Sequence, residues 1–212
     1  MGQAVVMSDF EAATEAANVE NKAELRRSIR QARRQRAENP SHSVHSDAAR
    51  IAEHVMDLEE IRHACAEGQP IACYVSRSDE PPTAALREQL LDAGATLLLP
   101  RIEGENLSWI HVTSQTSWVK NRWNIDEPEG PAFDGTPAVW VIPGLAVDAD
   151  GYRLGQGGGY YDRALESVHD DALIIAILFE DEVVAEVPRE VHDHRVDIVV
   201  TPERVRWLSM PD

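Results

Sequence analysis

The apolar residues of this chain gather in short, nearly continuous runs with little polar alternation. Runs of this kind are typical of strands that are covered on both faces. Five buried strands are predicted in this way, at residues 71–75, 96–100, 138–142, 172–179 and 196–200. A sixth strand, at residues 107–112, is expected to be antiparallel. These strands predict a central sheet.

Segments with helical spacing separate the strands. In residues 22–37, Leu25, Ile29 and Ala32 share one face of a helix that ends near Pro40. Further helices are predicted from after Ser43 to about residue 66, with a break near Met56, and then at residues 83–93 and 158–167. The alternation predicts an α/β fold with three layers, a mostly parallel sheet carrying helices on both faces.

The length of 212 residues fits a single domain. Residues 1–20 are rich in alanine and acidic residues and lack a sustained apolar stripe, so we expect a mobile or marginally helical extension there. Residues 21–212 are predicted to form the folded domain. We expect a monomer.

Composition narrows the class of protein. The hydrophobic content of 43% is that of a globular chain, and the net charge of -17 disfavours binding to nucleic acid or to anionic membranes. We find no apolar stretch long enough to span a membrane and no secretion signal. Cys65 and Cys73 lack metal or dithiol spacing and are predicted to be buried thiols in a reducing compartment. We therefore expect a cytoplasmic protein.

Positive charge is concentrated in one segment despite the acidic total. Seven cations stand against the single anion Glu24 in residues 22–36, a local excess of six: Lys22, Arg26, Arg27, Arg30, Arg33, Arg34 and Arg36. By itself such a stripe is most often a solvated helix face. It could also meet a small anionic ligand.

The densest chemical signal is the segment from Arg153 to Asp162, which reads Arg-Leu-Gly-Gln-Gly-Gly-Gly-Tyr-Tyr-Asp. Its four glycines lie between a predicted strand and a predicted helix, where backbone N–H groups can surround a phosphate. The spacing matches neither the dinucleotide fingerprint nor the P-loop. A flexible turn would explain the glycines alone, but the flanking Arg153 and Asp162 favour an anion site, since arginine binds phosphate oxygens and a carboxylate can hold Mg²⁺.

The longer run from Pro143 to Arg163 closely resembles the signature of the 5-formyltetrahydrofolate cyclo-ligase family. Shorter pieces of the resemblance follow in order through most of the chain: residues 22–26, 76–83, 99–101, 123–128 and 187–197. The resemblance implies a three-layer α/β enzyme that uses ATP and Mg²⁺ to convert 5-formyltetrahydrofolate to 5,10-methenyltetrahydrofolate, releasing ADP and phosphate. ATP would phosphorylate the formyl oxygen, and N10 would then close the ring. Such chemistry needs mainly positioning and charge stabilisation from the protein.

The resemblance also implies roles for individual residues. Arg153 and Tyr160 would be catalytic, and Asp162 and Asp193 would be associated with the metal. The ATP site would consist of Lys22, Arg26, Arg153, Leu154, Gly155, Gln156, Gly157, Gly158, Gly159, Tyr160 and Tyr161. The folate would contact Val75, Glu80 and Trp123, although Trp123 could instead anchor the long connection around it.

The chain departs from the family pattern in three places. Pro81 and Pro82 follow Glu80, Gly158 stands where some members carry lysine, and Gln156 stands where some carry arginine.

Other interpretations remain open from the sequence. His192 and His194 could suggest zinc, but alternate residues of a strand point apart and no third ligand is identified. A catalytically silent nucleotide- or folate-binding regulator on the same scaffold is the main alternative function. A sugar-phosphate or acyl-transfer enzyme on a similar sheet is a second alternative.

Overall fold

A computed structural model of the chain describes residues 2–39, 41–189 and 194–208, with side chains from residue 18 onward. Within these residues, seven strands form one sheet in the order β11-β10-β9-β6-β1-β2-β3. The five central strands pair in parallel, and β3 and β11 pair antiparallel at the two edges. The strands are β1 (Pro70–Ala72), β2 (Thr96–Glu103), β3 (Asn106–His111), β6 (Val139–Pro143), β9 (Leu173–Ile177), β10 (Ile198–Val200) and β11 (Val205–Trp207). The predicted mostly parallel sheet is confirmed, including the antiparallel strand after β2.

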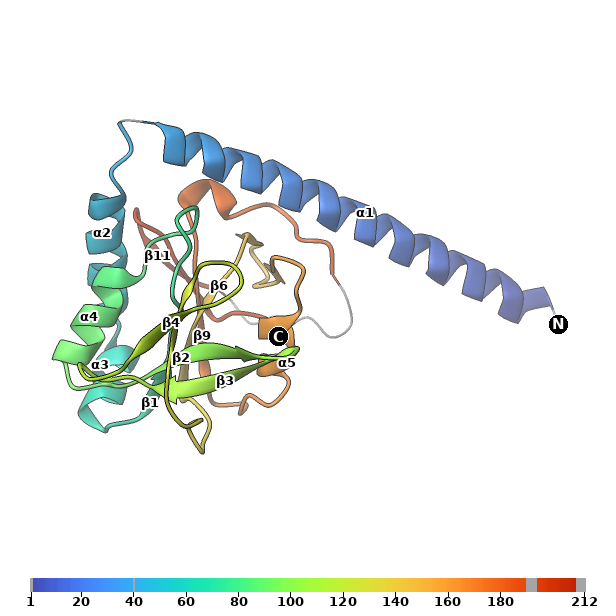
Figure 1. The fold of residues 1–212 in the computed structure, drawn as a ribbon. Coiled ribbons are helices and arrows are strands. Elements are labelled where there is room, and N and C mark those ends of the chain that lie inside the picture. Colours follow the sequence, from blue (N-terminus) through green and yellow to red (C-terminus); the bar gives the residue numbers. More distant parts are fainter. Residues whose placement is uncertain (1, 40, 190–193, 209–212) are drawn as a thin grey trace.

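Helices cover both faces of this sheet. One face is covered by α2 (Val44–Met56), α3 (Glu59–Ala66) and α4 (Ala84–Asp92), which lie together in Figure 1. The other face carries α5 (Tyr160–Leu165), whose Leu165 is fully buried. The predicted break near Met56 is confirmed, because α2 ends there and α3 begins at Glu59.

Successive residues of the strands enter opposite cores. Val139 and Val141 of β6 pack with α2, α3 and α4, while Trp140 and Ile142 pack on the α5 side. Burial on both faces is the reason that the strands read as continuous apolar runs.

Helix α1 (Gly2–Glu38) is continuous over 37 residues and projects beyond the sheet at its N-terminal end (Figure 1). It begins well before the predicted start at residue 22, and no break marks residue 21. Its Ile29 packs against Leu145, Ala146 and Leu154 in a third, smaller core. The division into an extension and a domain stays a prediction.

Two small ribbons lie outside the main sheet and were not predicted. One pairs β4 (Trp118–Lys120) with β5 (Asp126–Pro128), and the other pairs β7 (Ala146–Val147) with β8 (Arg153–Leu154). A turn containing the four glycines, residues 155–159, connects β8 to α5. Gly159 is the N-cap of α5 in a left-handed conformation with φ of 68°, so this helix starts two residues later than predicted.

The two cysteines are free, and Cys73 is fully buried while Cys65 is half-buried. Burial raises the pKa of Cys73 to about 12, so its thiol stays protonated and inert. In the part of the chain that the structure describes, no helix combines the length and apolar character needed to cross a membrane.

Candidate active site

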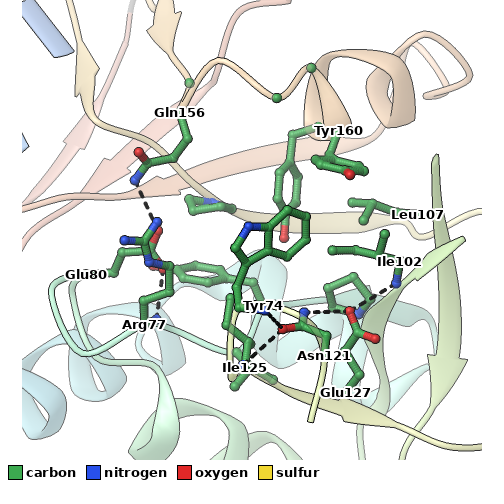
Figure 2. A pocket seen from close by; sticks show the side chains of 18 of the residues that line it. Tyr74, Arg77, Glu80, Ile102, Leu107, Asn121, Ile125, Glu127, Gln156 and Tyr160 are labelled. Atoms are coloured by element: carbon green, nitrogen blue, oxygen red, sulfur yellow. Dashed lines mark hydrogen bonds between the residues drawn. The ribbon is translucent and has the colours of Figure 1, made fainter. Parts of the chain in front are cut away.

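A cavity of about 510 Å³ opens beyond the carboxyl ends of the parallel strands. Its walls come from residues that follow β1, from the second half of β2, from the connection between β4 and β5, and from the glycine turn. Ligands of open α/β sheets bind at this end of the strands. In Figure 2, Arg77, Glu80 and Gln156 lie on one side of the cavity, and Ile102, Leu107 and Glu127 lie on the other.

Most of the site residues expected from the sequence line this cavity. They are Val75, Glu80, Trp123, Arg153, Gly155, Gln156, Gly158, Gly159, Tyr160, Tyr161 and Asp162. Four expected residues do not line the cavity: Lys22, Arg26, Leu154 and Gly157. Two of these four, Lys22 and Leu154, are buried, and so is the lining residue Arg153. Asp193, like His192, lies outside the described residues.

The cationic face of α1 packs directly on the glycine turn. Arg26 Nε donates to the Gly155 carbonyl at 3.0 Å, and Arg30 donates to both the side-chain and backbone oxygens of Gln156, at 3.1 and 2.7 Å. Gly157 has φ of 94°, and a Cβ there would lie 3.6 Å from the Arg26 guanidinium. Burial, with the neighbouring charges of Arg26 and Arg77, lowers the pKa of Arg30. Two segments far apart in the sequence therefore meet in one electropositive region.

Arg153 and Asp162 form an ion pair at the cavity wall. The Arg153 side chain is 4% exposed, and its Nη2 donates to an Asp162 oxygen while Nη1 donates to the Pro143 carbonyl at 3.2 Å. The Asp162 side chain is 49% exposed, so its carboxylate remains accessible from the cavity.

Glu80 is a buried carboxylate whose orientation is fixed from two directions. One oxygen accepts from the Arg77 backbone N–H at 2.9 Å, and the other accepts from Gln156 Nε2 at 3.4 Å. Because the Arg30 guanidinium can only donate, Gln156 must present its oxygen to Arg30 and its NH₂ group to Glu80. Gln156 thus connects α1 to Glu80.

Aromatic side chains line the middle of the cavity. Trp123 and Tyr160 meet edge to face, with ring centroids 6.2 Å apart, and Arg122 lies 4.0 Å above the Trp123 ring while it donates to the Tyr160 hydroxyl at 3.1 Å. Desolvation, with the nearby charge of Glu80, raises the pKa of Tyr74 and of Tyr161. These two phenols therefore stay protonated and can act only as hydrogen-bonding groups.

Several lining residues were missed from the sequence, among them Asn121, Glu127, Arg77 and Arg30. Glu127 falls inside the resembling piece 123–128, which was a signal that could have found it. Asn121 lies just outside that piece, and its local sequence carries no pattern that marks a site.

The resemblance expected from the sequence is confirmed by comparison with known proteins. Residues 18–202 match the model of the 5-formyltetrahydrofolate cyclo-ligase family. The 5-formyltetrahydrofolate cyclo-ligase of Mycolicibacterium smegmatis is 36% identical over 65% of this chain and 75% of its own length. The 5-formyltetrahydrofolate cyclo-ligase of Escherichia coli K12 is 34% identical over 64% of this chain and 79% of its own length.

Solved structures agree with this result. The NMR structure of Aquifex aeolicus 5,10-methenyltetrahydrofolate synthetase superposes with a TM-score of 0.73 at 28% identity, over 88% of this chain and 92% of that one. The Mycoplasma pneumoniae 5,10-methenyltetrahydrofolate synthetase, at 20% identity and a TM-score of 0.65, supports the fold. The chain belongs to the 5-formyltetrahydrofolate cyclo-ligase family.

Proposed function

We propose that this protein is an ATP-dependent ligase that converts 5-formyltetrahydrofolate to 5,10-methenyltetrahydrofolate and releases ADP and phosphate. The observation that carries the proposal is the meeting of two sets of residues at one cavity of about 510 Å³. Glu80 and Trp123, expected to bind the folate, line the same space as Arg153, Asp162 and the glycine turn, expected to bind the nucleotide. A cavity of this size suits a small-molecule site.

The nucleotide phosphates would lie against the glycine turn. Its backbone can approach phosphate oxygens closely because residues 155 and 157–159 have no side chain. Arg153 and Arg26 would add cationic donors from β8 and α1. Lys22, one helical turn before Arg26, is proposed as a further phosphate ligand.

The residues present fit Mg²⁺ as the partner of ATP. Among the described residues, no three acidic, histidine or cysteine side chains gather to hold a metal on their own. Mg²⁺ does not require such a group, because it commonly takes one or two carboxylates together with nucleotide phosphates and water. Asp162 would supply the carboxylate, with Asp193 as the second proposed ligand. The ion would neutralise charge on the transferred phosphoryl group.

The reaction would proceed in two steps within this cavity. The formyl oxygen attacks the γ-phosphorus of ATP and the bond to ADP breaks. N10 then attacks the activated formyl carbon and gives up its proton, which leaves with the phosphate. The carbon–oxygen bond breaks in this step and the methenyl cation remains. Arg153 and Tyr160 would orient the transferring group, since phosphoryl transfer depends mainly on alignment and on stabilisation of charge.

The folate would be recognised by Glu80 and the aromatic wall. The buried Glu80 carboxylate is oriented to accept hydrogen bonds from pterin N–H groups, and Trp123 and Val75 would contact the ring.

The acidic surface of the protein, with its net charge of -17, supports action on small molecules without nucleic acid or anionic membranes as partners. We propose a monomer that works in the cytoplasm.

One assay tests the proposal. The protein is mixed with 5-formyltetrahydrofolate, with and without ATP and Mg²⁺, and formation of the methenyl product is followed by its near-ultraviolet absorption. We expect the protein to form product only when 5-formyltetrahydrofolate, ATP and Mg²⁺ are all present. Glu80→Gln should raise the KM for the folate by about tenfold and leave the KM for ATP unchanged, since one charge-assisted acceptor is lost. Binding of both substrates without product would instead support the silent regulator.

A further inference from the structure

We propose that Asn121 and Glu127 act together as positioning residues that hold Trp123 at the cavity wall. The inference rests on the proposed function, because it assumes that Trp123 contacts the folate. It concerns Asn121, directly after β4, and Glu127, within β5, for which the sequence suggested no role.

Glu127 is a carboxylate buried at the cavity wall, with 8% of the residue exposed. Its Oε1 accepts from the backbone N–H of Ile102 at 3.2 Å and from Asn121 Nδ2 at 2.8 Å (Figure 2). The Ile102 N–H is accessible to a side chain because β1 pairs with β2 only as far as Leu98. Glu127 therefore joins β5 of the β4–β5 ribbon to the main sheet.

Asn121 extends these hydrogen bonds to the backbone of Trp123. The side-chain Oδ1 of Asn121 accepts from the backbone N–H groups of Trp123 and Ile125, at 2.9 and 3.1 Å. The backbone N–H of Asn121 donates to the Ile125 carbonyl at 2.9 Å. Only a side chain with both a donor and an acceptor can make these contacts and also reach Glu127. The turn also requires Asn124 at φ of 60°, a left-handed conformation that asparagine tolerates.

The Trp123 side chain has little else to fix it. The residue is 48% exposed, and its ring contacts are with Tyr160 and Arg122. An exposed indole on a turn keeps one orientation only if the backbone beneath it is held. The hydrogen-bonded series from Ile102 through Glu127 and Asn121 to Trp123 supplies this restraint.

A merely structural role would have a different signature. All three residues of β4 are exposed, and Asn121 is only partly buried. Loss of the contact should therefore alter the position of Trp123 and the affinity for the folate, and it should leave the affinity for ATP nearly unchanged. A general loss of structure would instead weaken the binding of both substrates.

The test uses a pair of complementary substitutions. Asn121→Asp keeps the acceptor for the turn but sets a second carboxylate against Glu127, so the two groups repel. We expect the KM for the folate to rise about tenfold while the KM for ATP stays within twofold. Adding Glu127→Gln supplies a donor to the new aspartate, and the double variant should return to within about threefold of the wild type. Glu129→Gln, at an exposed position directly after β5, is the matched control and should change neither constant.

A second measurement does not depend on activity. In protein labelled with 5-fluorotryptophan, the ¹⁹F resonance of Trp123 is assigned by its loss in Trp123→Phe. Asn121→Asp should shift or broaden that resonance, the double variant should restore it, and Trp140 in the core should not respond.

The proposal is overturned if the double variant is no better than Asn121→Asp, if both KM values rise equally, or if the Trp123 resonance is unmoved. A wild-type protein that forms no methenyl product would contradict the proposed function. In that case the ¹⁹F experiment would still test the positioning role.

Discussion

The cationic face of α1 has different partners in two parts of the helix. In the earlier part, Arg26 and Arg30 donate to oxygens of Gly155 and Gln156, all of which are neutral. In the later part, Arg33 is 1% exposed and donates to both oxygens of Glu182, at 2.6 and 2.8 Å. The same residue type at helical spacing thus meets carbonyl groups in one region and a carboxylate in the other.

The charge of the partner explains what each region can do. Glu182 neutralises Arg33, and a further bond to the Gly144 carbonyl at 2.7 Å helps to fix α1 on the domain. Desolvation opposes the charge of Arg33, but the hydrogen bonds and charge of Glu182 outweigh it and raise the pKa of Arg33. Neutral acceptors position Arg26 and Arg30 without cancelling their charge. An anionic ligand can therefore bind beside Arg26 and Arg30, whereas Arg33 contributes to the stability of the fold.

The largest effect is expected from Arg33→Ala. The variant leaves the buried Glu182 carboxylate with only the more distant Arg36, whose Nη1 lies 3.9 Å from Oε1. Breaking a buried pair from one side costs about 3–5 kcal/mol. We expect the free energy of unfolding, measured in urea, to fall by about that amount. In protein that remains folded, both KM values should stay near those of the wild type.

Two variants sharpen this result. Arg34→Ala removes an exposed cation from the next position of the helix and should change stability by less than about 0.5 kcal/mol. Replacing Arg33 and Glu182 together by Met and Leu removes both charges and should recover much of the loss. Equal destabilisation by the Arg33 and Arg34 variants would show that the buried pair does not stabilise the fold.

A smaller and different effect is expected from Arg26→Ala. Loss of a guanidinium beside the glycine turn should raise the KM for ATP about tenfold, or about 1.4 kcal/mol, with little change in stability or in the KM for the folate. Initial rates at varied ATP measure the change. The exposed neighbour Arg27 provides the control as Arg27→Ala. A stability loss as large as that of Arg33→Ala, with ATP affinity unaltered, would place Arg26 with the later region and remove it from the site.

Burial on both faces is the reason that the strands of the sheet could be predicted. The predicted strand at 71–75 nevertheless ends at Ala72, because Tyr74 and Val75 leave the sheet to line the cavity. Strand β4 has only three residues, all exposed, so it forms no buried apolar run, and that ribbon was missed.

The candidate site was predictable only where its residues stand close together in the sequence. The segment from Arg153 to Asp162 is compact enough to be recognised. Glu127 and Asn121 take their roles from hydrogen bonds to β2 and to a turn, which no local pattern encodes. In the same way, Arg26 and Arg33 have the same residue type and stand in the same helical stripe of the sequence. Their roles differ only because the fold places the glycine turn beside Arg26 and Glu182 beside Arg33.

The smallest effect on the free energy of unfolding is expected from Asp181→Asn, which alters a second ion pair in the later part of α1. Arg36 pairs with Asp181, but the Asp181 side chain is 57% exposed. Arg36 has two further contacts, the Phe179 ring 3.9 Å from its guanidinium and Glu182 Oε1 3.9 Å from its Nη1. Exposed ion pairs contribute about 0–1 kcal/mol because water and salt screen them. Asp181→Asn should therefore lower the free energy of unfolding by less than about 1 kcal/mol in low salt. The difference from the wild type should shrink further in about 1 M NaCl, where the screening length is about 3 Å. A loss that matched Arg33→Ala and persisted in salt would mean that burial does not distinguish the two pairs.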